Sequence, residues 1–149
     1  MDTLLKEVWS IDVSIGVKKD ADAWTYAPLC AGIESFEESL NGQNQQYFFL
    51  SEHGYAHNEV TGLAPQYTVS GKRVYGDEAQ DYICSLKYKL GAERKTSLKL
   101  SWQTQDNKAV TTVCDATILD ISDVGGAAVD NVPFSCVIAL DGCPTVTTT

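Results

Sequence analysis

The stretch Val69 to Leu100, VSGKRVYGDEAQDYICSLKYKLGAERKTSLKL, has the pattern of a strand, a helix and a second strand. Before and after its middle, apolar and polar residues alternate with a period of two, which is typical of half-buried strands. In the middle, apolar residues recur at helical spacing and fall on one narrow arc of a helical wheel. These residues are Ala79, Tyr82, Ile83, Leu86 and Leu90.

Both ends of this helix are marked in the sequence. Asp77 is a good N-cap, Gln80 three residues later would complete a capping box, and Glu78 favours the positive end of the helix dipole. Gly91 can adopt the left-handed conformation that ends many helices. We therefore predict a helix from about Asp77 to Leu90.

The helix carries a second, smaller apolar patch. Cys84 and Tyr88 lie four residues apart, on the side away from the main apolar stripe. Such a pair can be an inert thiol beside a surface tyrosine, because isolated exposed apolar residues are common. It can equally be a contact with another subunit, and we keep both as candidates.

Length and composition narrow the class of protein. A chain of 149 residues fits a single domain, 1–149, that buries about 70% of the surface exposed by its unfolded form. Its 5 cysteines are an odd number without CxxC pairs, which favours a reduced cytosolic protein with free thiols. The N-terminus does not resemble a signal peptide, and no apolar run approaches the length of a membrane span. A net charge of −9 without a basic stripe argues against nucleic-acid binding.

The remaining segments predict further strands and one long projection. The first seven residues look like a mobile arm, and Ser51 to Pro65 has no sustained period, so it should be an exposed loop or a protruding hairpin. The Thr-rich tail 144–149 should be mobile until something docks it. Other strands are expected at Trp9 to Val17, Trp24 to Tyr26, Cys30 to Glu38, Gln45 to Leu50 (buried on both faces at its end), Val110 to Ile121 and Val132 to Leu140. The predicted fold class is mainly β (α+β): an antiparallel β-sandwich or barrel with one flanking α-helix.

No segment has the pattern of an active site. His53 and His57 with Glu52 and Glu59 have a metal-like composition, but the order is not HExxH and no third ligand suggests itself. Nucleophile elbows, Cys-His signatures and phosphate-binding glycine loops are missing as well. We predict neither catalysis nor a bound cofactor or metal.

Several of these residues together resemble a known family. Val60-Thr61-Gly62 is followed by Gly71-Lys72-Arg73-Val74, then by the run Gly76 to Ser85 and by Gly91 to Thr96. This order resembles major tail (tail tube) proteins of long-tailed, siphovirus-type phages and prophages, most densely from Thr61 to Leu98. Members tend to have proline where this chain has Glu78, and a bulkier residue where it has Cys84.

The resemblance implies a structural virion protein that self-assembles into stacked, hexameric rings. These rings form a tail tube, assembled in the bacterial host cytoplasm, through which DNA passes without specific binding. Implied partners are further copies of the chain, a tape-measure protein, a tail-tip or baseplate initiator and a tail terminator. Candidate contacts between subunits are Cys84, Tyr88, Ser51, Glu52, His53, Tyr55, His57, Asn58 and Glu59, and candidates for an acidic lumen lining are Glu34, Glu37 and Glu38.

Other functions stay open at this point. The tube protein of a contractile tail or of a type VI-like secretion system would share the fold. A monomeric β-sandwich module could instead hold a ligand in the loop Ser51 to Pro65. A hydrolase or metal enzyme using His53 and His57 is a third possibility.

Overall fold

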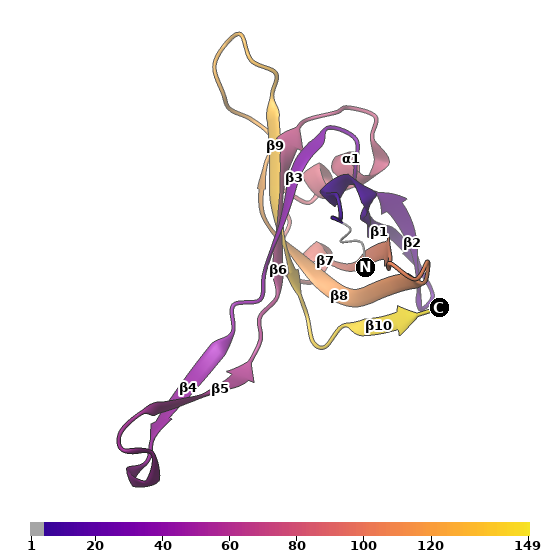
Figure 1. Ribbon diagram of the computed structural model, residues 1–149. Coiled ribbons are helices and arrows are strands. Elements are labelled where there is room, and N and C mark those ends of the chain that lie inside the picture. The colour runs from indigo at the N-terminus through magenta and orange to yellow at the C-terminus, as the bar shows by residue number, and fades with distance from the viewer. Residues whose placement is uncertain (1–4) are drawn as a thin grey trace.

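The fold is an open antiparallel β-structure with one α-helix, as the sequence predicts (Figure 1). The computed structural model describes residues 5–149. The strands are β1 Asp12–Asp20, β2 Ala23–Pro28, β3 Ile33–Ser39, β4 Gln43–Phe48, β5 Ala56–Gly62, β6 Gln66–Lys72, β7 Lys95–Gln103, β8 Ala109–Ser122, β9 Pro133–Leu140 and β10 Thr145–Thr148. The helix α1 spans Glu78–Ser85, and short 3-10 helices occupy Val8–Ser10 (η1), Leu50–Glu52 (η2) and Gly91–Arg94 (η3). No helix in the described part of the chain is long and apolar enough to cross a membrane.

One continuous sheet contains all strands except β4 and β5. Its order is β2-β1-β7-β8-β9-β6-β3, with β10 attached to β8. The long strand β8 joins the two halves of this sheet, because its first part pairs with β7 and β10 and its last part pairs with β9. The sheet thereby bends into two layers that face each other without closing into a barrel (Figure 1).

The core lies between these layers. Its largest fully buried apolar side chains are Ile15, Ile83, Ile118, Phe134 and Ile138. Apolar side chains on one face of each strand alternate with exposed or half-buried ones on the other, as in β6 and β9. Helix α1 packs Ala79 and Ile83 against this core and contacts β1, β2 and β8.

The predicted helix begins where expected and ends early. The Asp77 carboxylate accepts a hydrogen bond from the Gln80 backbone N–H at 3.1 Å, as an N-cap should. The helix ends at Ser85, however, so the prediction that it runs to Leu90 is wrong. The Arg94 guanidinium donates to the carbonyl oxygens of Lys87 and Lys89, at 2.7 and 2.9 Å, and so holds this segment in a turn.

Strand β1 is shifted relative to the prediction. Trp9 belongs to the 3-10 helix η1 and is exposed, whereas the strand starts at Asp12 and continues to Asp20. The turn forms because Ser10 donates both its backbone N–H and its hydroxyl to the Glu7 carbonyl. Of the predicted N-terminal arm, residues 1–4 lie outside the described residues and residues 5–7 are exposed.

Two further expectations are wrong. Strand β4 is not buried on either face, because every residue from Gln43 to Phe48 is exposed. The Thr-rich tail forms strand β10, which pairs with β8 from Thr145 to Thr148. Local composition predicts neither outcome, because strand burial and pairing depend on which neighbours the fold supplies.

Candidate assembly surfaces

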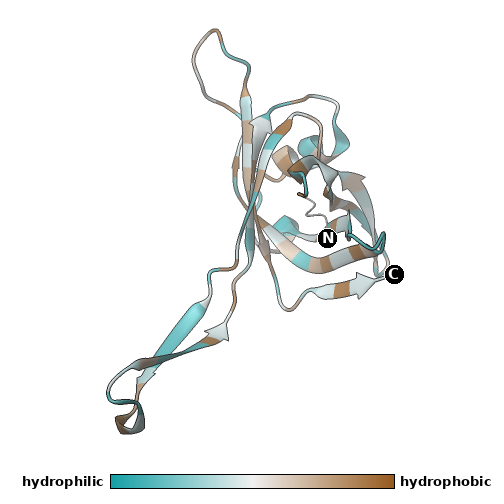
Figure 2. Ribbon diagram, in the orientation of Figure 1, coloured by the Kyte–Doolittle hydropathy of each residue, from teal (hydrophilic) through white to brown (hydrophobic). Residues whose placement is uncertain are grey.

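The most prominent surface is a hairpin that stands away from the body of the molecule. Strands β4 and β5 pair only with each other, from Gln43–Gly62 at the base to Phe48–Ala56 near the tip (Figure 1). The prediction of a loop or protruding hairpin at Ser51 to Pro65 therefore finds the tip and the second strand, but misses the first strand. Figure 2 shows that the first strand is hydrophilic and that hydrophobic residues gather towards the tip.

The tip is an exposed cluster of aromatic and aliphatic side chains. The rings of Tyr47 and Phe49 stack with centroids 6.0 Å apart, and the His57 ring lies 5.8 Å from that of Phe49. His57 Nε2 also lies 2.5 Å from a Glu52 carboxylate oxygen. The exposed large apolar side chains here are Tyr47, Phe48, Phe49, Leu50 and Tyr55, which we call the hairpin tip cluster.

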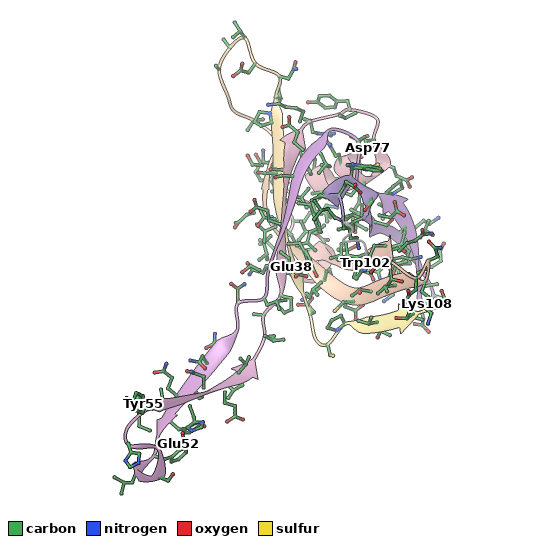
Figure 3. All side chains as sticks on the ribbon, viewed as in Figure 1. Glu38, Glu52, Tyr55, Asp77, Trp102 and Lys108 are labelled. Carbon is green, nitrogen blue, oxygen red and sulfur yellow. The ribbon has the colours of Figure 1, made fainter. Side chains whose placement is uncertain are left out.

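The structure brings most of the predicted contact residues together on this hairpin. All of them are exposed, and Figure 3 shows Glu52 and Tyr55 at its far end. Within residues 5–149 there is no group of three or more His, Cys, Asp or Glu side chains with the arrangement of a metal site. The predicted residues on the hairpin are Ser51, Glu52, His53, Tyr55, His57, Asn58 and Glu59.

Sequence reasoning missed the larger side chains of the tip. The sequence predicts a buried strand end at Phe48, Phe49 and Leu50, because aromatic runs in strands are usually buried. The polar run Gln43 to Gln46 just before them could have signalled a strand without a core-facing side.

A groove on the body of the molecule is a second candidate surface. It has a volume of about 850 Å³ and opens where the two layers of the sheet separate, beside the base of the hairpin. Its lining is mostly apolar and includes Phe36, Leu63, Tyr67, Leu100, Trp102 and Leu140. No pattern in the sequence marks this groove, because its walls come from segments far apart in the chain.

A partly buried hydrogen bond lies in the groove wall. The Tyr67 hydroxyl donates to the Glu38 carboxylate at 2.6 Å, and the Tyr67 ring stacks on Phe36 with centroids 5.2 Å apart. Burial, together with this carboxylate, raises the pKa of Tyr67 well above its usual range. The tyrosine therefore stays neutral and keeps Glu38 oriented towards the groove.

The three predicted lumen acids do not share one surface. Glu37 pairs with Thr68 on the outer face of the sheet, whereas Glu38 pairs with Tyr67 on the opposite, groove side. Glu34 falls at an irregularity in the pairing of β3 with β6. An acidic lining by all three together is thus incompatible with the register, and their relation to a lumen stays a prediction.

The predicted patch of Cys84 and Tyr88 is not formed. Tyr88 follows the end of α1 and is 88% exposed, whereas Cys84 is half-buried against the core. Two ion pairs lie beside the thiol: Arg73 with Asp81 and Lys87 with Asp123, both at 2.8 Å. The contact of the exposed Tyr88 and the half-buried Cys84 with another subunit stays a prediction.

The free thiols divide into two reactivity classes. Burial raises the pKa of Cys84 to about 11 and that of Cys136 to about 12, and burial also raises the pKa of Cys114. Because the thiolate is the reactive form, these three thiols should react slowly, whereas the exposed Cys30 and Cys143 should react quickly. A maleimide titration followed by mass spectrometry should find two labels in the native protein and all five in denaturant. Rapid labelling of a third thiol would contradict this burial pattern.

In the larger sheet, three strands leave an edge without a partner in the described chain. Strands β2, β3 and β10 each pair with one neighbour only. An open edge presents unpaired backbone groups that another chain can pair with, which is a hazard in a monomer and a means of association in an assembly.

The β8–β9 connection projects at the end of the molecule opposite the hairpin, with Val124 and Val129 exposed (Figure 1).

Comparison with known proteins places this architecture among components of tail-like particles. No protein-family model and no curated protein sequence matches the chain. One similar solved structure is the tube-terminating cap of the anti-feeding prophage, with a TM-score of 0.61 and 13% identity over 100% of this chain and 97% of that one. A second is the tail of an empty GTA particle with C6 symmetry, with a TM-score of 0.66 and 12% identity over 96% of this chain and 99% of that one.

A third similar structure is the sheath–tube complex of the extracellular contractile injection system PVC in its extended state. Its TM-score is 0.57, with 14% identity over 96% of this chain and 90% of that one. These likenesses, at such low identity, establish a shared fold. The chain therefore has the fold of phage-tail-like tube and cap proteins.

Proposed function

We propose that this chain is a structural building block of a phage-tail-like tube, without catalytic activity. It associates with further copies of itself into rings, six chains to a ring, and the rings stack into a hollow tube that DNA or another cargo crosses without specific binding. The main observation behind the proposal is that this fold has a different projection at each end. The β4–β5 hairpin projects at one end and the β8–β9 connection at the other. Unlike ends support head-to-tail association, which gives rings when the rotation closes and filaments when it does not.

The open strand edges support ring formation. An exposed edge such as that of β3 or β2 can extend its sheet into the next chain, and a closed ring leaves no such edge unpaired. The outer face of the β3–β6–β9 layer suits a channel wall. It presents small side chains, including Ser35, Thr68, Ser70 and Ser135, with Glu37 among them.

Two kinds of tail fit this proposal equally. The sequence resemblance favours a non-contractile, siphovirus-type tail, whereas one of the similar structures comes from a contractile injection system. A tube protein of either kind would be part of a virion or particle tail, assembled in the bacterial host cytoplasm. Its partners would be a tape-measure protein, a tail-tip or baseplate initiator and a tail terminator. A sheath gene beside the gene of this chain would favour the contractile kind.

The test is self-association as a function of concentration. Light scattering across a wide concentration range, followed by negative-stain microscopy, should show rings or hollow filaments of uniform width. Because tube proteins can await an initiator, a sample that stays monomeric should be repeated with the tail-tip protein encoded beside it. A monomer under both conditions would contradict the tube proposal and favour a monomeric binding module.

A further inference from the structure

Among residues 5–149, the hairpin tip cluster has no partner outside the hairpin. Leu50 is 98% exposed and lies beyond the last pair of residues joined by the two strands, and Phe48, 64% exposed, belongs to that last pair. An isolated two-stranded hairpin is at best marginally stable in water, and contiguous exposed apolar patches commonly mark interaction sites. The hairpin therefore has the properties of an element that is completed by contact with another molecule.

The groove is a mostly apolar surface that no segment of the described residues fills. Tyr67 and Leu100 are buried beneath it, and Leu63 is exposed at its rim. Its two charged side chains are both engaged: Glu38 accepts from the Tyr67 hydroxyl, and Lys6 Nζ lies 4.5 Å from the centre of the Trp102 ring. An apolar segment that enters the groove thus meets a carboxylate that already accepts a hydrogen bond and an ammonium group that already lies over an aromatic ring.

The tip cannot fill the groove of its own chain. The hairpin starts from the groove rim, where Leu40 precedes β4 and Leu63 follows β5. Each strand then runs away from the body for about 20 Å, at about 3.3 Å per residue. Figure 3 shows Glu52 and Tyr55 at the distal end, far from Glu38 and Trp102.

We propose that the hairpin tip cluster of one copy docks into the groove of a second copy. This inference rests on the proposed function and specifies one of its contacts. Both surfaces are largely apolar, and the Glu52 carboxylate at the tip already has a partner in the His57 ring. The two surfaces differ, so the contact is heterologous and each chain can give one tip and receive another.

The size of the contact explains why it would act within an assembly. Partly exposed aromatic and leucine side chains of the tip offer on the order of 500 Å² for burial. Stable isolated complexes bury about 800 Å² on each partner. One tip in one groove is therefore too small to hold a dimer, whereas a chain in a ring or stack makes the contact twice, once through its tip and once through its groove.

The native thiol of Cys143, which lines the groove, allows a direct test by cross-linking. The parent protein carries Cys30→Ser, which removes the other exposed thiol. Leu50→Cys then places a thiol on the tip, and a short bismaleimide is added to the assembled protein. We expect a ladder of cross-linked multimers that disappears when Cys143→Ser is added.

Matched controls accompany this test. Leu90→Cys places a thiol at an equally accessible leucine on the body, 83% exposed, and should give no ladder. Phe48→Asp and Val60→Asp change two hairpin side chains that are each 64% exposed. The first, at the tip, should lower the cross-linked yield at least tenfold, whereas the second, near the base, should leave it unchanged. Both should keep the melting temperature of the body, because the hairpin lies outside the core.

Microscopy of the same samples separates the two proposals. Tubes without a ladder that depends on Cys143 would overturn the docking inference and leave the proposed function standing. A ladder that persists with Cys143→Ser would overturn it in the same way, because the tip would then contact another tip or another surface. Absence of both assemblies and cross-links would count against both proposals.

Discussion

Gly71→Ala should lower the free energy of unfolding by about 4 kcal/mol, the largest effect that we expect from a single methyl group in this protein. A Cβ at this position would lie 2.1 Å from the Gly32 carbonyl oxygen and 2.7 Å from the Ile33 Cα. Both are backbone atoms, so no side chain can rotate away to make room. The start of β3 would have to leave β6, which breaks the hydrogen bond from Lys72 N–H to Gly32 and opens the edge of the sheet.

Urea unfolding followed by circular dichroism measures this effect. Gly62→Ala is the matched control, since it also changes a strand glycine but meets only ordinary contacts with Gln43 at 3.8 Å. The control should change stability by less than about 0.5 kcal/mol. Equal stability of the two variants would show that the start of β3 does not approach Gly71 of β6 as closely as the structure indicates.

Gln80→Ala should cost about 3 kcal/mol, because a fully buried amide then leaves several backbone groups without partners. The Gln80 Nε2 donates to the carbonyl oxygens of Ala31 and Lys72, at 2.8 and 3.1 Å. Its Oε1 accepts the backbone N–H of Val74 at 2.8 Å. The side chain thereby ties helix α1 to the ends of two separate segments.

Glu78→Ala is the control for this second prediction. It changes an exposed residue of the same helix and removes only a favourable interaction with the helix dipole, so it should cost less than about 1 kcal/mol. Thermal and urea unfolding of both variants measure the difference. A Gln80→Ala variant as stable as Glu78→Ala would mean that other groups or water satisfy the backbone around α1.

The contacts at Gln80 show which interactions of the helix can be predicted from neighbouring residues and which cannot. The sequence correctly predicts that Asp77 caps the helix, because that contact joins residues three apart. The predicted return contact of a capping box is not made, because the Gln80 side chain reaches Val74, Ala31 and Lys72 instead. The contact with Ala31 joins residues 49 positions apart and leaves no local pattern.

The candidate surfaces show the same division. The alternation of apolar and polar residues predicts β6, β7, β8 and β9, and the loss of any period after Ser51 predicts a projection. The groove could not be predicted, because its walls come from β3, β6, β7, β8 and β9 together with the N-terminal segment. Glu37 and Glu38 lie on opposite faces of β3, because successive side chains of a strand alternate between its two faces.

The sequence alone determined the strand, helix and strand between Val69 and Leu100, because capping and alternation are properties of neighbouring residues. It also determined the antiparallel, mainly β class. Only the tertiary structure decided that the helix stops at Ser85, where Arg94 holds the following carbonyl groups, and that the Thr-rich tail pairs with β8. The exposure of the aromatic hairpin tip was likewise a tertiary outcome, because an apolar side chain is buried only where the fold brings another surface against it.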